Sequence, residues 1–169
     1  APDDESAARA LFHVRTMPWR YGGGTPEDRA KTEELLATWL PRAKDALTLN
    51  AFARYLTTQG RAEEAVSAAT RAATLDPACV GCFDTLGGAL FRTGQFAAAL
   101  EAQERGVAIL GERQGWIQTR ERLDLYRKAS TAIAGWKARA AASPAPAALP
   151  ADVTVAVQLA QTFHLRACY

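Results

Sequence analysis

Three cysteines and two histidines carry the most reactive side chains of this 169-residue chain. Cys79 and Cys82 form a Cys-Val-Gly-Cys motif shortly after Pro77, where a helix is expected to begin. A helix N-terminus stabilises a thiolate, so the spacing suits thiol–disulfide exchange, but the strand–helix–strand setting of redox motifs is missing. We therefore favour a local Cys79–Cys82 disulfide in a secreted protein, or two buried thiols in a cytosolic one.

Other chemistry for these cysteines meets obstacles in the sequence. A zinc site needs four ligands, which this motif could complete with His164 and Cys168 only if the tail folded back onto it. Haem attachment requires a histidine directly after the second cysteine, where this chain has Phe83. Cys168 is then the remaining cysteine, either free or bonded to another chain. We expect no metal and no cofactor.

The other side chains with catalytic potential lack partners at useful spacings. His13 and His164 each stand between two apolar residues, and no serine lies in a nucleophile-elbow motif. Paired acids at residues 33–34 and 63–64 are typical of solvated helix faces. The three glycines at residues 22–24 lack the Gly-Lys-Ser/Thr ending of a phosphate-binding loop. The sequence therefore predicts a protein that is not an enzyme.

Two similar segments of equal length, residues 46–79 and 80–113, follow each other directly and must position the cysteine motif. Matching positions are apolar or small in both: Leu49 and Phe83, Phe52 and Leu86, Ala53 and Gly87, Leu56 and Leu90, Gly60 and Gly94, Ala65 and Ala99, Ala72 and Gly106. Apolar residues at i, i+3, i+4 and i+7 mark one face of a helix, and the shared glycines suit a tight turn. Each segment therefore predicts two antiparallel helices, the second over residues 62–75 or 95–110. A fixed period of this length is typical of an α-solenoid.

These residues resemble the tetratricopeptide repeat, whose pattern combines Leu-Gly, a turn glycine, an alanine and a closing proline. The first segment carries Leu49, Phe52-Ala53, Gly60, Ala65 and Asp76-Pro77, and the second carries Phe83, Leu86-Gly87, Gly94, Phe96, Ala99 and Leu100. The two segments depart from the pattern at three places. Leu56 and Leu90 stand where one aromatic residue is usual, and Ala69 and Gln103 stand where a second is usual. Gly111 stands where a proline is usual. The resemblance covers residues 46–113 as two repeats. It implies an all-α, right-handed α-solenoid of antiparallel helix pairs.

The resemblance also implies that the first helix of each repeat lines a concave groove that binds a partner. By position, the groove residues are Asn50, Arg54, Thr57, Thr58, Asp84, Thr85, Gly88, Phe91 and Arg92. The family's Lys/Asn/Arg clamp for a terminal carboxylate is not reproduced, but Arg54 and Arg92 would favour an acidic or C-terminal group. Phe91 is expected to be an exposed aromatic anchor. The alternative is that these side chains are simply solvated.

Residues 1–45 predict two N-terminal capping helices. One is expected over residues 4–17 and the other from Pro26 to about residue 40, with a loop over residues 18–26 between them. Thr25 is a typical N-cap, because Pro26 follows it at the first helical position and an acid lies three residues after it.

The chain after the repeats predicts three further segments. Residues 114–142 are expected to form a C-terminal capping helix, either unbroken or as a pair, with charges around one apolar stripe. Residues 143–150 are an Ala/Pro linker. Residues 151–169 are an apolar tail, for which we favour a helix over a strand.

Composition argues against several classes of protein. The net charge of +2 is too small to imply binding to nucleic acid, and no run of 18 apolar residues could span a membrane. The chain begins with Ala-Pro-Asp-Asp-Glu. We therefore expect that a signal peptide or anchor has been removed and that the protein lies in a bacterial periplasm or outside the cell, with the cytoplasm as the alternative.

Together these features predict a non-enzymatic scaffold or adaptor that binds a protein partner in the groove, as part of a larger assembly. One alternative is the C-terminal tetratricopeptide region of a larger membrane enzyme, such as a glycosyltransferase. Another is a self-assembling subunit of a filament or complex, in which the partner is the chain itself, joined through the tail and Cys168.

Overall fold

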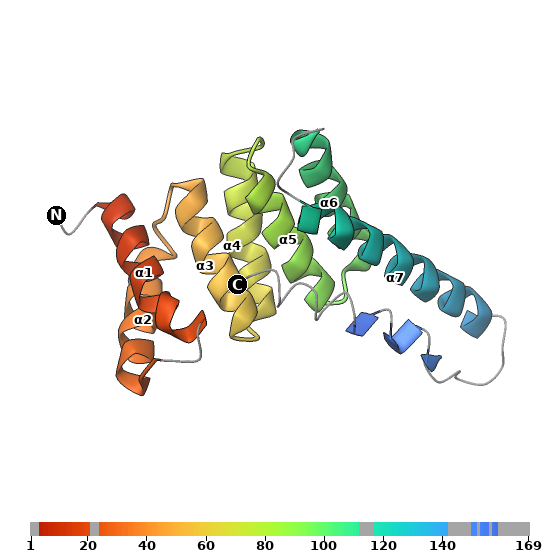
Figure 1. Cartoon of the computed structure of the whole chain (residues 1–169), viewed down its shortest axis with the longest axis horizontal. Coiled ribbons are helices and arrows are strands. Elements are labelled where there is room, and N and C mark those ends of the chain that lie inside the picture. Colours follow the sequence, from red (N-terminus) through yellow and green to blue (C-terminus); the bar gives the residue numbers. More distant parts are fainter. Residues whose placement is uncertain are drawn as a thin grey trace.

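The computed structural model describes residues 4–20, 24–111 and 117–141, together with 150–151, 153–155 and 157–158. Helices make up most of these residues, and none of them lies in a strand (Figure 1). The helices are α1 (Glu5–Arg20), α2 (Pro26–Trp39), α3 (Ala46–Thr58), α4 (Ala62–Leu75), α5 (Val80–Arg92), α6 (Phe96–Leu110) and α7 (Ile117–Ala141). The predicted all-α class is confirmed.

Helices that follow one another in the chain pack as neighbours. α3 packs on α4 and α5 packs on α6, each pair being joined by a short turn. α4 contacts α5 and α3 also contacts α5, so the two pairs lie side by side. α1 contacts α2 and α3 at one end, and α7 contacts α6 at the other, so that Figure 1 shows the helices in chain order.

The helix boundaries recur with the period seen in the sequence. The spacing from Ala46 to Val80, which we call one repeat length, separates both the starts and the ends of α3 and α5, and it also separates the starts of α4 and α6. Gly60 and Gly94 have φ values of 77° and 78°, a left-handed backbone that glycine adopts without steric cost. In each turn the residue after this glycine donates its N–H to the carbonyl of Leu56 or Leu90. The predicted helix pairs and turns are confirmed, with α6 beginning one residue later than expected because Gln95 is its N-cap.

The core of the described residues consists of two clusters of buried side chains, which meet at α5. The first cluster contains side chains from each helix from α1 through α5. In it the ring of Phe12 meets the rings of Phe52 and Tyr55 edge-on, with ring centroids 4.7 and 5.3 Å apart. The second joins α5, α6 and α7 around Phe91 and Tyr126. Small buried residues let α4 and α6 approach their neighbours closely; they are Ala65, Ala68, Ala69, Ala72 and Ala99.

The N-terminal helices differ from the prediction in one respect. α1 continues to Arg20, so the loop expected over residues 18–26 is shorter than predicted. Pro18 lies in the last turn of α1, where its missing N–H removes a single helical hydrogen bond at the end of the element. The start of α2 is as predicted: the Thr25 hydroxyl accepts the Asp28 N–H at 3.1 Å, and the Asp28 carboxylate accepts the Thr25 N–H at 3.0 Å.

The C-terminal part settles two choices that the sequence left open. α7 is one unbroken helix rather than a pair. The described residues from 151 to 158 are helical, as favoured. Val153 is buried and Val157 packs against the cluster around Phe91 and Tyr126, so this part of the tail lies against the helices. Most of the linker and residues 159–169 lie outside the described residues.

Candidate partner-binding surface

The predicted groove residues come from α3 and α5, which contact each other. The structure divides them by exposure. Side chains at least partly exposed are those of Asn50, Arg54, Thr58, Asp84 and Arg92. Buried residues are Thr57, Thr85, Gly88 and Phe91. Only the first group is in a position to touch a partner.

Phe91 is not the exposed anchor that the sequence predicted. Its side chain is 1% exposed. Its ring stacks on that of Tyr126 from α7, with the centroids 4.5 Å apart, and meets Phe96 edge-on at 5.0 Å. α7 therefore covers the part of α5 that would otherwise expose Phe91, and the residue belongs to the core.

Thr57, Thr85 and Gly88 likewise take no part in an open groove. The Thr57 hydroxyl donates a hydrogen bond to the carbonyl of Ala53 at 2.8 Å, within its own helix. Thr85 and Gly88 lie in the buried face of α5. The expectation that these three residues line a surface is therefore wrong. In the folded chain, neighbouring helices bury more of the side chains of α3 and α5 than the two repeats alone would bury.

Asp84 has a partner inside the chain. It forms an ion pair with Arg122 of α7, and Gln103 of α6 donates a hydrogen bond to it at 2.9 Å. Arg122 is 2% exposed, and Gln103 also donates to the carbonyl of Thr119 at 3.0 Å. A buried charge stays in place only with such a partner and additional hydrogen bonds. Asp84 therefore holds α6 and α7 against α5.

Sequence reasoning missed Gln103 and Arg122. One signal was available for Gln103, which stands in the second repeat where the first has Ala69. A polar residue at a position that is buried in the other repeat indicates a buried hydrogen-bonding group. No comparable signal marked Arg122, because α7 does not continue the repeat pattern.

A second polar cluster joins α2, α3 and α4 away from these residues. The Tyr55 hydroxyl donates to Glu33 at 2.7 Å, and Arg61 forms ion pairs with Glu33 and Glu64 at 2.6 Å each. Burial, followed by the hydrogen bond to Glu33, raises the pKa of Tyr55. These groups satisfy one another, so the cluster stabilises the stack of helices rather than offering free groups to a ligand.

Asn50 and Arg92 remain as polar residues with unused hydrogen-bonding capacity. Within the described part of the chain, Asn50 Oδ1 and Arg92 Nε are buried atoms without a hydrogen-bond partner. One is an acceptor and the other a donor, and they lie on adjacent helices. With Arg54 and Thr58, they form what we call the α3–α5 surface.

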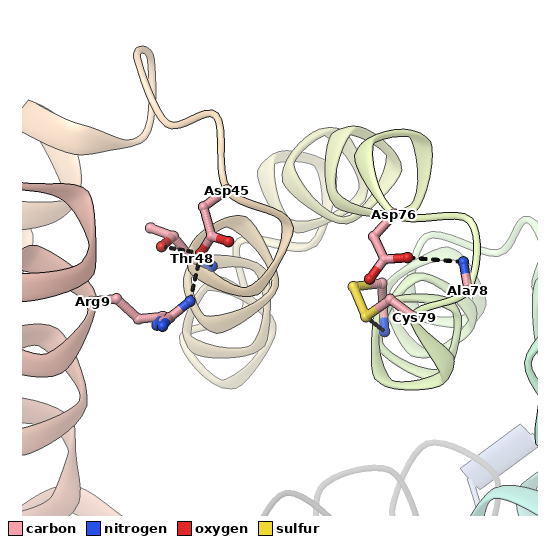
Figure 2. Close-up of a disulfide and its surroundings, with 7 residues drawn as sticks. Arg9, Asp45, Thr48, Asp76, Ala78 and Cys79 are labelled. Atoms are coloured by element: carbon pink, nitrogen blue, oxygen red, sulfur yellow. Dashed lines mark hydrogen bonds and ion pairs between the residues drawn. A yellow bond between two sulfur atoms is a disulfide. The ribbon is translucent and has the colours of Figure 1, made fainter.

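Cys79 and Cys82 form a disulfide at the start of α5, with their sulfur atoms 2.13 Å apart (Figure 2). The local pairing favoured from the sequence is confirmed. Two of the four ligands of the alternative zinc site are therefore bonded to each other, and the other two, His164 and Cys168, lie outside the described residues. Among the residues that the structure describes, no group of three or more His, Cys, Asp or Glu could hold a metal ion.

None of the helices in the described ranges combines the length and the apolar character needed to cross a membrane. No family model matches the chain, and neither a curated protein nor a solved structure shows significant similarity to it.

Proposed function

We propose that this chain is a tetratricopeptide-like protein, a right-handed α-solenoid in which α1–α2 and α7 cap two repeats, and that it binds a protein partner on the α3–α5 surface. The observation that carries this proposal is the recurrence of helix boundaries and of the turn glycine after one repeat length. Helix pairs stacked at a constant period extend a continuous surface of first helices, which suits an extended peptide.

The charges of the α3–α5 surface favour an acidic partner. Arg92 is the charged member that carries this preference, while the carboxylate of Asp84 on the same helix is compensated by Arg122. Guanidinium groups bind carboxylates through charge-assisted hydrogen bonds, often in pairs. Asn50 adds a partly exposed amide side chain, a polar group that can hydrogen-bond a peptide. We therefore propose that the partner segment is an acidic peptide or a free C-terminus.

The disulfide supports a location outside the cytoplasm, because disulfides persist in oxidising compartments such as the periplasm and the cell exterior. This location stays a proposal. It also suits a non-enzymatic adaptor, because a covalent link stabilises the fold.

Selection of peptides from a displayed library tests the function. The library presents random C-terminal segments with equal numbers of acidic and basic members, and selected peptides are then measured by calorimetry. We expect acidic C-terminal peptides, and we expect Arg92→Glu to weaken their binding by about tenfold or more, since a charge-assisted hydrogen bond contributes about 1.5–3 kcal/mol.

Lys128→Glu is the matched control, because it makes the same change in net charge at an exposed position on α7. It should leave the affinity within about twofold, since interactions with exposed, distant charges are largely screened by salt. Equal losses in the two variants, or a selection without acidic preference, would contradict the proposed binding surface.

A further inference from the structure

The two equivalent helices α3 and α5 begin with chemically different N-caps. At α3 the Asp45 carboxylate accepts the N–H of Thr48 at 2.8 Å and its hydroxyl at 2.7 Å, and Arg9 donates to the same oxygen at 2.6 Å. At α5 the equivalent positions, one repeat length later, hold Cys79 and Cys82. The Cys79 sulfur accepts the Cys82 N–H at 3.1 Å and is bonded to the Cys82 sulfur (Figure 2). The cap of α5 therefore keeps the backbone hydrogen bond of the α3 cap and adds a covalent link to it.

The two cysteines of this cap differ in exposure to solvent. Cys82 is 0% exposed and belongs to the first core cluster, whereas Cys79 is partly exposed at the cluster's edge. Thiol–disulfide exchange requires a thiolate to approach a sulfur atom, so an external thiol is expected to attack at Cys79 rather than at the fully buried Cys82. Cys79 also lies at the N-terminus of α5, where N–H groups and the helix dipole stabilise a sulfur anion.

We propose that the Cys79–Cys82 pair is a redox-responsive helix cap that exchanges with small thiols and disulfides of the glutathione class through Cys79. A thiolate attacks the Cys79 sulfur, the Cys79–Cys82 bond breaks, and its electron pair moves to Cys82, which takes up a proton. A second thiolate attacks the external sulfur of the mixed disulfide and leaves Cys79 as a thiolate. Two thiols thus become one disulfide, and the protein gains two electrons.

The first repeat shows why the fold tolerates this change. The start of α3 is held without a covalent link, by the Asp45–Thr48 hydrogen bonds and the ion pair between Asp45 and Arg9, so a helix at this position of the repeat can form without one. After reduction the Cys79 sulfur keeps its position as acceptor for the Cys82 N–H, as the carboxylate does in α3. Reduction therefore loosens the start of α5 without unfolding the chain, which makes exchange in the native state reversible.

The full chain with Cys168→Ser, which removes the third cysteine, is equilibrated in buffers of increasing reduced-to-oxidised glutathione ratio. Trapping with iodoacetamide and mass spectrometry then give the state of each cysteine, and circular dichroism gives the helix content. We expect complete, reversible reduction at unchanged helix content, with glutathione in the mixed disulfide attached to Cys79. Reduction only where the helix signal is lost, or glutathione attached to Cys82, would overturn the proposal.

A variant that copies the α3 cap into α5 provides the control. Cys79→Asp combined with Cys82→Thr, in the Cys168→Ser chain, should fold and should show the same unfolding midpoint with and without dithiothreitol. The chain that keeps the disulfide should show an unfolding equilibrium constant about tenfold larger after reduction, the usual effect of weakening an N-cap. A midpoint that reductant leaves unchanged in the disulfide chain, or shifts equally in both chains, would refute a redox-responsive cap.

Discussion

Replacement of Gly87 by alanine should destabilise the chain, although alanine is the better helix former. Gly87 lies inside α5, where groups of α6 and α7 come close to its backbone. A Cβ atom there would lie 2.9 Å from Gln103 Oε1, 3.2 Å from the carbonyl oxygen of Ala99 and 3.5 Å from Tyr126 Cε2. The first two distances are shorter than ordinary contacts, so the neighbouring groups would have to move.

The size of the effect follows from opposing contributions. Glycine to alanine inside a helix gains about 1 kcal/mol, whereas overpacking a close contact costs about 1–3 kcal/mol. Gln103 cannot turn away freely, because its amide donates to Asp84 and to the carbonyl of Thr119. Weakening each of these hydrogen bonds adds about 0.5–1.5 kcal/mol. We expect a net loss of about 1–5 kcal/mol in the free energy of unfolding.

Gly106→Ala in α6 is the matched control. A Cβ atom there would lie 3.4 Å from Phe83 Cβ and 3.6 Å from the carbonyl oxygen of Val80, which the structure can accommodate. The first repeat already has Ala72 at the equivalent position. Gly106→Ala should therefore be neutral or stabilise the chain by up to about 1 kcal/mol.

Urea unfolding followed by circular dichroism measures both variants under the same conditions. A Gly87→Ala chain that is as stable as Gly106→Ala would refute the close packing of α5 against α6 and α7. Adding Gln103→Ala gives a second test, since the first repeat combines Ala53 with Ala69 at the equivalent positions. In that background Gly87→Ala should cost less, because the shortest contact is gone.

Three further predictions concern the core and the caps. Phe91→Ala should lower the free energy of unfolding by about 3–5 kcal/mol in the same urea assay, because a buried ring is removed; a change below about 0.5 kcal/mol would place Phe91 on the surface. Asp84→Asn should cost about 3–5 kcal/mol by leaving Arg122 buried without its charge partner, whereas the exposed Asp124→Asn on α7 should change stability by less than about 1 kcal/mol. Burial raises the pKa of Asp45, but the Thr48 hydroxyl and N–H and the Arg9 guanidinium lower it more, so its net pKa lies below the ordinary value. Asp45 therefore stabilises the fold above about pH 4, and this contribution disappears as the pH falls through the lowered pKa. The free energy of unfolding of the unchanged chain should therefore exceed that of Asp45→Asn by less as the pH is lowered. A difference that grows in acid would contradict a lowered pKa for Asp45.

Much of the fold was predictable because its signals are local. Gly60 and Gly94 mark turns that require a left-handed backbone, and small residues mark close helix contacts in both segments. Thr25 and Asp28 form a capping box that can be recognised from four consecutive residues. The disulfide was also favoured from the spacing of Cys79 and Cys82.

The predicted surface was less successful because exposure depends on distant parts of the chain. Phe91 and Asp84 lie at positions that face outward in an isolated repeat, but α7 covers the first and neutralises the second. α7 has no repeat pattern, so nothing in its sequence indicated where it would pack. The equivalence of Cys79 with Asp45 is present in the repeat of the sequence, but the role of Asp45 as the N-cap of α3 is shown only by the structure.

The most direct test of the proposed function is to map the site of peptide contact by amide chemical shifts of the ¹⁵N-labelled chain during titration with a selected acidic C-terminal peptide. We predict that the largest shifts lie on α3 and α5, at Asn50, Arg54, Thr58 and Arg92. Largest shifts on the exposed residues of α4 and α6, with α3 and α5 unchanged, would contradict it.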